Sequence, residues 1–315
     1  MADLVRIREV GLRDGLQLVK DVLPTEFKLE WIEAAAGAGL PEIEVTSYVP
    51  PHVIPQFADA DAVTAAALDV PGTLASALAV NLKGAERAYD LGIGKINYVI
   101  SASEMHSRAN VRRTRQEAVE AFRAMAAERR SRGLEGKVAL SCGIATAFGC
   151  TLQGEVAEAD VLRLVAEAVE AGADEIMIAD TVGYADPLRV RRLFAAVLAE
   201  TGSTPVAAHF HDTRGLGLAN VMAAVETGIR RFDASLGGLG GCPFAPGATG
   251  NIDTEDTVYL LETQGLSTGI DMRALLDLRS RLSAWLPNET LGGAVQKAGI
   301  PGLADSYPSL ASAMA

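Results

Sequence analysis

The segment Val169–Thr181, which reads VEAGADEIMIADT, joins the end of a helical stretch to a short apolar strand. Gly172 follows the alanine-rich stretch, where glycine is the expected C-terminal cap of a helix. The run after it, EIMIAD, is apolar through its centre and shows no alternation with polar residues. Such a run is typical of a strand buried on both faces in a parallel sheet. The segment therefore predicts one helix–strand unit of a parallel α/β fold.

The same order of helix, glycine and strand recurs along the chain. Three further segments repeat it: 34–47 (AAAGAGLPEIEVTS), 88–101 (AYDLGIGKINYVIS) and 225–236 (VETGIRRFDASL). Additional strand-like runs lie at 5–10, 73–80, 137–142 and 205–210. Together these segments predict eight strands, each followed by a helical segment. We therefore expect an α/β fold that closes into a (β/α)8 TIM barrel, with an open doubly wound sheet as the alternative.

The organisation of the chain indicates one domain. It has 315 residues, and no proline- or serine-rich linker divides it. That length suits one large α/β barrel. We expect the barrel to occupy residues 1–270. The tail, 271–315, falls outside the eight units and is predicted to form extra C-terminal helices that pack on the barrel, not a separate domain.

The charge balance argues against nucleic acid and anionic lipid as partners. The chain has 40 acidic and 28 basic residues, a formal net charge of −12. Its densest basic segment, Arg108–Arg115, is short and has no interleaved aromatic residues. No apolar run is long enough for a signal peptide or a membrane span. The three cysteines (142, 150 and 242) have no paired spacing, which fits a reducing compartment. We expect a soluble, cytoplasmic protein.

Polar residues gather where the predicted strands end, which is the catalytic face of such a barrel. The first strand leads into Gly11–Gln17 (GLRDGLQ), where Arg13 and Asp14 are adjacent. Neighbouring side chains on an extended chain point in opposite directions, so the two charges need not pair. Glycine at 11 and 15 is expected to let the backbone bend tightly at the mouth of the barrel.

The seventh strand ends in a pair of histidines that favours a metal site. His209 and His211 are two residues apart on an extended segment, so both imidazoles face the same side. Asp14 would add an anionic oxygen. Asn251 would add a neutral oxygen, or else be a turn residue. A mixed set of two nitrogens and two oxygens suits Mg²⁺ or Mn²⁺ better than a closed zinc site.

For several other polar and sulfur-bearing residues, a structural role is an alternative to a catalytic one. Glu44 lies alone among apolar residues of the second strand, so it requires a cationic partner, and Arg13 is the natural one. Asp180, at the end of the sixth strand, is either an acid or a turn cap. His106 is expected in a solvated loop, as is His52. Cys142 and Cys150 are expected to be small buried residues.

The glycine-rich segment Gly237–Asn251 (GGLGGCPFAPGATGN) follows the eighth strand. It does not match a phosphate-binding loop, because no Gly-Lys-Ser/Thr follows it. It contains one cysteine, Cys242, between a glycine and a proline. Spacing alone does not assign a role to this cysteine.

At this point the sequence resembles the hydroxymethylglutaryl-CoA lyase family, within the DRE-TIM metallolyases. The matching motifs occur in the family's order and are, in this chain, RDGLQ (13–17), IEVTS (43–47), NLKG (81–84), ASE (102–104), DTVG (180–183), HFHDT (209–213), GGLGGCPFAPGATGN (237–251) and TEDTVYLLE (254–262). The cysteine-bearing glycine segment is the most specific of them, because related synthases and aldolases lack it. The resemblance implies a pyruvate carboxyltransferase-like catalytic barrel.

The resemblance also implies the site and the reaction. It implies a divalent metal held by Asp14, His209, His211 and Asn251. The catalytic groups it implies are Arg13, Asp14, Glu44, His209 and Cys242, and the supporting ones are Gln17, Asp180 and Glu255. The implied reaction is retro-Claisen cleavage of 3-hydroxy-3-methylglutaryl-CoA, or a close analogue, to acetyl-CoA and a keto acid. A lyase of citramalyl-CoA and a Claisen-type synthase or aldolase are the alternatives. A CoA thioester is the implied partner, and a homodimer or higher homo-oligomer the implied assembly.

The chain departs from the family pattern at several points. Leu12 stands where the family commonly has proline, and Leu18-Val19 where it has Asn-Glu. The segment 145–156 (ATAFGCTLQGEV) differs from the GCPYEG-like sequence of many members. Because this segment borders the substrate in the family, the difference bears on the 3-alkyl group of the substrate and not on the type of reaction. The C-terminal thiol of the mitochondrial members is missing from SYPSLASAMA.

Overall fold

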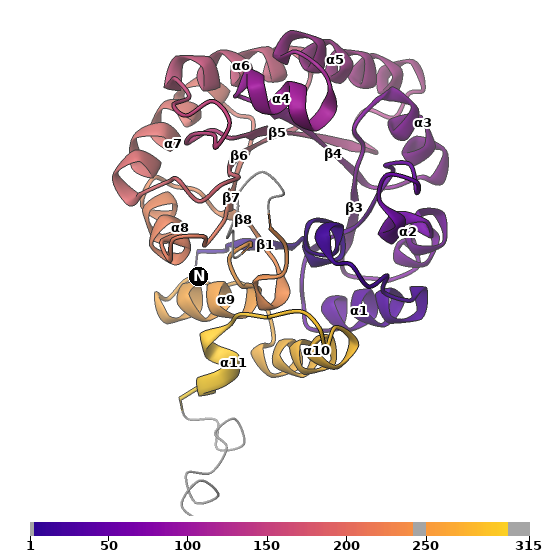
Figure 1. Cartoon of the computed structure of the whole chain (residues 1–315), viewed down its shortest axis with the longest axis vertical. Coiled ribbons are helices and arrows are strands. Elements are labelled where there is room, and N and C mark those ends of the chain that lie inside the picture. The colour runs from indigo at the N-terminus through magenta and orange to yellow at the C-terminus, as the bar shows by residue number, and fades with distance from the viewer. Residues whose placement is uncertain (1–2, 242–249, 302–315) are drawn as a thin grey trace, which may run out of the picture.

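The computed structural model describes residues 3–241 and 250–301 of the chain. Across these residues eight parallel strands, each paired with the next and β8 with β1, close into a barrel (Figure 1). The strands are β1 (Arg6–Glu9), β2 (Glu42–Ser47), β3 (Leu74–Leu78), β4 (Lys95–Ser101), β5 (Ala139–Ala145), β6 (Glu175–Asp180), β7 (Val206–Phe210) and β8 (Arg231–Ala234). This confirms the predicted (β/α)8 barrel and excludes the open sheet.

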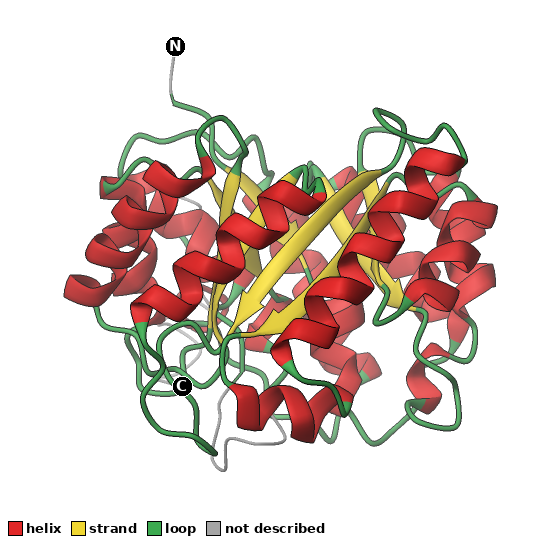
Figure 2. Cartoon of the chain, turned by 90° about the horizontal axis from the view of Figure 1, so that it is seen from above, coloured by secondary structure: helices red, strands yellow, loops and turns green. Residues whose placement is uncertain are grey.

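Helices surround the barrel on its outside (Figure 2). In the order of the chain they are α1 (Thr25–Gly37), α2 (Ala60–Leu68), α3 (Leu82–Leu91), α4 (Glu104–Val111), α5 (Arg115–Ser131), α6 (Glu158–Ala171), α7 (Pro187–Thr201), α8 (Gly217–Glu226), α9 (Thr254–Thr263), α10 (Met272–Trp285) and α11 (Ala294–Ala298). The last two are the C-terminal helices expected from the tail. The rings of Phe27 and Trp285 stack 5.3 Å apart, so α10 packs on α1.

Local sequence sets the ends of these helices. Gly172 caps α6 in the left-handed conformation, with φ of 101°. Thr114 and Glu117 form a reciprocal capping box at the start of α5, which satisfies two otherwise unpaired amides. The fifth strand was predicted to end at Cys142. It continues to Ala145, because its pairing with β4 extends to that residue.

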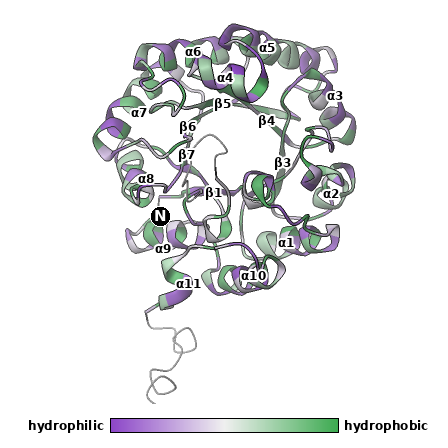
Figure 3. Cartoon of the chain, viewed as in Figure 1, coloured by the Kyte–Doolittle hydropathy of each residue, from purple (hydrophilic) through white to green (hydrophobic). Residues whose placement is uncertain are grey.

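The apolar core lies between the barrel and the ring of helices. Figure 3 shows that the ring helices carry both hydrophobic and hydrophilic residues, as expected when one side of each faces the barrel. Trp31 of α1, Phe122 of α5 and Phe194 of α7 are fully buried against it. Within the described part of the chain, no helix is both long enough and apolar enough to cross a bilayer.

Candidate active site

Three separate parts of the chain bring the predicted ligands together at the mouth of the barrel. Asp14 lies in η1 (Gly11–Gly15), a π-helical turn just after β1. His209 is in β7, and His211 forms an isolated bridge with Asn251, which follows β8. The mouth is therefore built from the carboxyl ends of neighbouring strands, as in other barrels of this type.

Asp14, His209 and His211 form a cluster with the dimensions of a metal site. The two Nε2 atoms of the histidines are 3.2 Å apart. Oδ2 of Asp14 lies 3.9 Å from Nε2 of His209 and 4.0 Å from Nε2 of His211. A triangle with these three sides has a circumscribed circle of about 2.2 Å radius, which is close to the usual length of a metal–ligand bond. One cation can therefore contact all three atoms at once.

One buried polar atom beside this cluster fits the same interpretation. Among the described residues, Oδ1 of Asn251 has no hydrogen-bond partner. The amide nitrogen of Asn251 donates to Oδ2 of Asp14 at 2.9 Å and to the carbonyl of Leu239 at 3.1 Å. Asn251 is therefore held against Asp14 while its carbonyl oxygen is left available. The donor set present suits a divalent cation.

The protonation states also suit a cation. Burial alone would raise the pKa of Asp14, but Arg13 and the two histidines outweigh it and lower that pKa to about 2. Burial and then the neighbouring His209 lower the pKa of His211 to about 4. For His209, burial acts downward, yet the hydrogen bond and charge of Asp233 raise the pKa. At neutral pH the site therefore offers a carboxylate and a neutral imidazole, the forms that bind metals.

Arg13 connects this cluster to Glu44. Its Nε donates to Oε2 of Glu44 at 2.6 Å, so the predicted pairing of these residues is confirmed. Its Nη1 donates to Oδ1 of Asp14 at 2.7 Å. The expectation that Arg13 and Asp14 point apart is therefore wrong, because the segment is a π-helical turn and not an extended chain.

The glycines of this turn serve a different purpose from the one expected. Neither Gly11 nor Gly15 has a positive φ. A Cβ at Gly11 would instead lie 2.5 Å from the carboxylate of Glu9 and 2.7 Å from the ring of Trp31. A Cβ at Gly15 would lie 3.1 Å from the side chain of Leu239. Close packing, rather than backbone conformation, requires glycine here.

The three residues expected to support the site differ in their surroundings. Gln17 lines the cavity at the mouth. Asp180 accepts hydrogen bonds from the amides of Tyr184 (2.7 Å) and Ala185 (3.0 Å), as in the turn-cap alternative. Glu255 is buried in α9 and bonds to the amide of Gly237, at the start of the glycine segment. Cys242 lies outside the described residues, so its predicted role stays a prediction.

The mouth opens into a cavity of about 390 Å³ that includes Arg13, Asp14 and both histidines in its lining. Much of the rest of its lining is apolar and includes Leu78, Val99 and Met177. His106 also lines it: this side chain is 4% exposed on α4, with Nδ1 2.7 Å from Oγ of Ser101. The expectation of a solvated loop histidine is wrong, because His106 lies on α4, which packs on β4.

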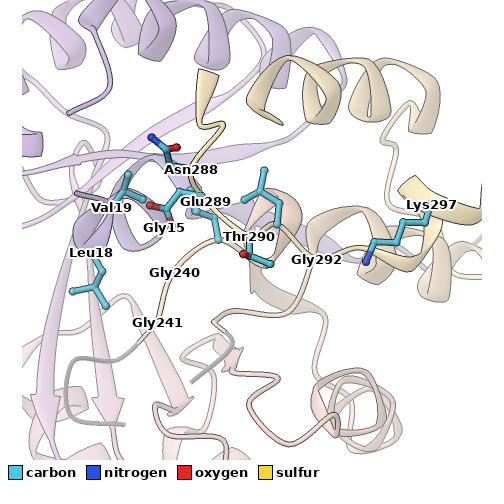
Figure 4. A pocket seen from close by; sticks show the side chains of 13 residues that line it. Gly15, Leu18, Val19, Gly240, Gly241, Asn288, Glu289, Thr290, Gly292 and Lys297 are labelled. Carbon is cyan, nitrogen blue, oxygen red and sulfur yellow. The ribbon is translucent and has the colours of Figure 1, made fainter. Parts of the chain in front are cut away.

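A second cavity of about 540 Å³ adjoins the first at Gly241. Its lining comes from η1 and the residues after it, from the glycine segment, from the stretch between α10 and α11, which includes Asn288, and from Lys297 of α11 (Figure 4). Lys297 is the one side chain among its lining residues with a positive charge.

Three inward-facing residues were not anticipated from the sequence. Arg8, Asn97 and Asp233 are buried on β1, β4 and β8. Asp233 bonds to His209 and Asn97 bonds to Glu44, while Arg8 bonds to both Asp233 and Asn97. Their signal is a charged or amide side chain two positions from another polar one in a buried strand, as in RIRE, KIN and RFDA. Such side chains share one face, which here is the interior of the barrel.

Comparison with known proteins agrees with this architecture. The HMGL-like family model matches residues 4–282. The chain is 38% identical over 291 residues to the hydroxymethylglutaryl-CoA lyase YngG of Bacillus subtilis, which covers 91% of this chain and 96% of that protein. It is 40% identical over 307 residues to the (R)-citramalyl-CoA lyase of Chloroflexus aurantiacus, covering 94% and 95%.

A solved structure is similar over the same length. It is an HMG-CoA lyase from Acinetobacter baumannii in complex with coenzyme A and 3-methylmalate, with a TM-score of 0.89 and 40% identity. The match covers 95% of this chain and 96% of that one. These matches confirm the family resemblance expected from the motifs. The chain belongs to the HMGL-like family.

Proposed function

We propose that the protein is a divalent-metal-dependent acyl-CoA lyase. In this proposal it cleaves 3-hydroxy-3-methylglutaryl-CoA, or a close 3-hydroxy-3-alkyl analogue, to acetyl-CoA and acetoacetate or the analogous keto acid. The observation that carries the proposal is the cation-sized triangle of Asp14, His209 and His211, with Arg13 bonded to it inside the same cavity. The lyases of CoA thioesters among its relatives support the substrate class.

The reaction makes three demands on the site. The 3-hydroxyl must lose its proton, the enolate oxygen of the departing acetyl-CoA must be stabilised, and C2 must gain a proton. When the C2–C3 bond breaks, its electron pair passes to the thioester enolate and C3 becomes the carbonyl of the keto acid. A divalent cation bound at the site would polarise substrate oxygens and lower the pKa of the 3-hydroxyl. We propose Mg²⁺ or Mn²⁺, because the donor set includes carboxylate and amide oxygens.

We assign removal of the hydroxyl proton to Asp14 and His209. Their facing atoms, Oδ2 and Nε2, are 3.9 Å apart, so the charge of each acts on the pKa of the other: Asp14 raises that of His209, and His209 lowers that of Asp14. Nδ1 of His209 donates to Oδ2 of Asp233 at 3.1 Å, which leaves Nε2 turned toward the cluster. General-base help of this kind typically contributes about 10²–10⁴-fold to the rate.

Arg13 is assigned to the enolate oxygen. Its Nε and Nη1 are engaged by Glu44 and Asp14, and among the described residues its Nη2 has no hydrogen-bond partner. Glu44 is 1% exposed and fixes the guanidinium of Arg13. The positive charge of Arg13 is therefore in place before negative charge develops on the enolate oxygen. Cys242 is proposed to protonate C2, as the family resemblance implies.

The CoA part of the substrate requires more room than the metal ligands occupy. We propose that the acyl group enters the first cavity and that the thioester extends toward the second, which adjoins it at Gly241. We also propose that residues 1–270 act as the catalytic domain and 271–315 as an extension on it. The homo-oligomer stays a prediction, which sedimentation velocity tests.

A substrate panel tests the function. Purified protein with Mg²⁺ or Mn²⁺ is given 3-hydroxy-3-methylglutaryl-CoA, longer 3-alkyl analogues and citramalyl-CoA, with and without EDTA. Release of acetyl-CoA and a keto acid, abolished by EDTA, is expected. Preferential cleavage of citramalyl-CoA would support the second candidate, to which a relative of 40% identity points. No product from any of these thioesters at metal saturation would reject the proposal.

A further inference from the structure

The interior of this barrel is charged. In TIM barrels the inward-facing layers are usually filled with branched apolar side chains. Here the described strands and the η1 turn contribute four carboxylates and four cations that bond to one another: Glu42, Glu44, Glu175, Asp233, Arg8, Arg13, Lys95 and Arg231. Burying such groups is costly unless each finds its partner, so their arrangement calls for an explanation beyond packing.

One branch of this network runs from Arg8 to His209. Nε of Arg8 donates to Oδ1 of Asp233 at 2.7 Å, and Nη2 of Arg8 lies 2.6 Å from the same oxygen. The other oxygen of Asp233 accepts Nδ1 of His209 at 3.1 Å. A carboxylate that holds the far nitrogen of a metal-binding histidine sets the orientation and tautomer of the ring. Arg8 in turn sets which oxygen of Asp233 is free for the histidine.

A second branch runs from Arg8 to Arg13. Nη1 of Arg8 donates to Oδ1 of Asn97 at 3.4 Å, and Nδ2 of Asn97 donates to Oε1 of Glu44 at 2.8 Å. The remaining oxygen of Glu44 accepts Nε of Arg13 at 2.6 Å. An amide is suited to this place because it accepts from a guanidinium on one side and donates to a carboxylate on the other.

The two branches meet at one guanidinium. We propose that Arg8 and Asn97 are positioning residues which, through Asp233 and Glu44, orient His209 and Arg13 relative to each other. Neither residue reaches the mouth. The described residues that line the cavity at the predicted metal ligands include neither Arg8 nor Asn97. Their roles rest on the proposed function, in which His209 and Arg13 act on the same substrate.

The chain offers a matched control for this network. Lys95 is 3% exposed inside the same barrel, two positions before Asn97 on β4. Its Nζ donates to Glu175 at 2.6 Å and to Glu42 at 3.2 Å, and in the described structure it bonds to neither Asp233 nor Glu44. Glu42 and Glu175 also bond to Nη1 of Arg8, each at 3.2 Å. Removing the charge of Lys95 therefore disturbs the ion network around Arg8 but removes none of the bonds that make up the two branches.

The experiment compares the wild type with Arg8→Met, Asn97→Asp and Lys95→Met. Mn²⁺ affinity is measured by electron paramagnetic resonance, together with kcat, KM and Tm. Arg8→Met is expected to weaken Mn²⁺ binding by about 10- to 100-fold, as expected when the support of a metal-binding histidine is lost. Asn97→Asp places a second carboxylate against Glu44. It is expected to lower kcat by about 10- to 100-fold, with Mn²⁺ affinity within about threefold of wild type.

Lys95→Met is expected to lower Tm while Mn²⁺ affinity and kcat stay within about threefold of wild type. If Lys95→Met reduces both as much as Arg8→Met does, the network acts only through stability and the proposal is wrong. Unchanged Mn²⁺ affinity in Arg8→Met would also overturn it. Mn²⁺ binding needs no turnover, so this readout stands even if the wild type cleaves none of the tested thioesters.

Arg8→Lys covers the case in which Arg8→Met does not fold. Lysine keeps the charge but lacks the planar fork of arginine. One ammonium can replace the bond to Asp233 but cannot also reach Asn97. Mn²⁺ affinity is therefore expected to stay within about threefold of wild type while kcat falls as in Asn97→Asp. An unchanged kcat in Arg8→Lys would contradict the branch through Asn97.

Discussion

The carboxylate of Glu9, at the last position of β1, accepts a hydrogen bond of 2.6 Å from the hydroxyl of Thr254, at the first position of α9. Its other oxygen accepts the amides of Gly11 at 2.8 Å and Leu236 at 3.1 Å. Glu9 is fully buried. One side chain therefore joins the turn that carries Asp14 to the two segments that flank the glycine segment.

This arrangement predicts a pH-dependent stability. Burial raises the pKa of Glu9 to about 7, although its three hydrogen bonds act in the opposite direction. The unfolded chain has a pKa near 4.3, so between these values the folded protein keeps a proton that the unfolded chain has released. The contribution of Glu9 to the free energy of unfolding therefore decreases as pH rises from about 4.3 to 7, and it is level above that.

Glu9→Gln keeps the shape of the side chain and cannot ionise. Urea unfolding of both proteins at pH 5 and pH 8 measures the difference. We expect the wild type to lose on the order of 2–3 kcal/mol relative to the variant between these two pH values. Parallel stability profiles for the two proteins would show that Glu9 does not titrate in this range.

Gly11 is predicted to tolerate no side chain. Gly11→Ala brings a methyl group against Glu9 and Trp31 and should lower the free energy of unfolding by about 1–3 kcal/mol. Gly37, at the end of α1, is the matched control, because a Cβ there meets nothing within 4 Å. Gly37→Ala should be neutral or stabilising by up to about 1 kcal/mol. Chemical denaturation of both variants tests this pair, and equal losses would contradict the packing argument.

His211 is predicted to be a metal ligand. Removing one of the four predicted protein ligands in His211→Ala should reduce Mn²⁺ affinity by at least about 100-fold and abolish activity at micromolar metal. His52→Ala is the control, because His52 is exposed and is not one of the residues of the cluster. Isothermal titration calorimetry with Mn²⁺ measures both. Similar affinities in the two variants would place the cation elsewhere.

Arg13 is predicted to act on the rate of the chemical step. Arg13→Lys keeps a charge but loses the fork that holds Glu44 and Asp14 together, and kcat should fall by about 10²–10³-fold. Arg123→Lys, at a half-buried position of α5 where the arginine pairs with Glu120, should leave kcat unchanged. Steady-state assays of acetyl-CoA release compare them. A change confined to KM would mean that Arg13 binds the substrate without stabilising the transition state.

Much of the fold follows from local sequence. Some signals act within a few residues, such as the helix-capping Gly172 and the apolar run of β6. They can be recognised in the sequence without the tertiary structure. The spacing of His209 and His211 can be interpreted in the same way, because a strand places alternate residues on one side. The ligand types and the order of the strands were therefore predictable.

Only the tertiary structure decided how these residues meet. Arg13 and Asp14 bond to each other because their turn is π-helical, and His106 is buried because α4 packs on β4. Arg8 contacts Asn97 and Asp233 only because the closed barrel brings β1, β4 and β8 together across its interior. Such contacts join residues up to 225 positions apart in the chain. No local pattern specifies contacts of that range, whereas closure of the barrel brings all of these side chains into its interior.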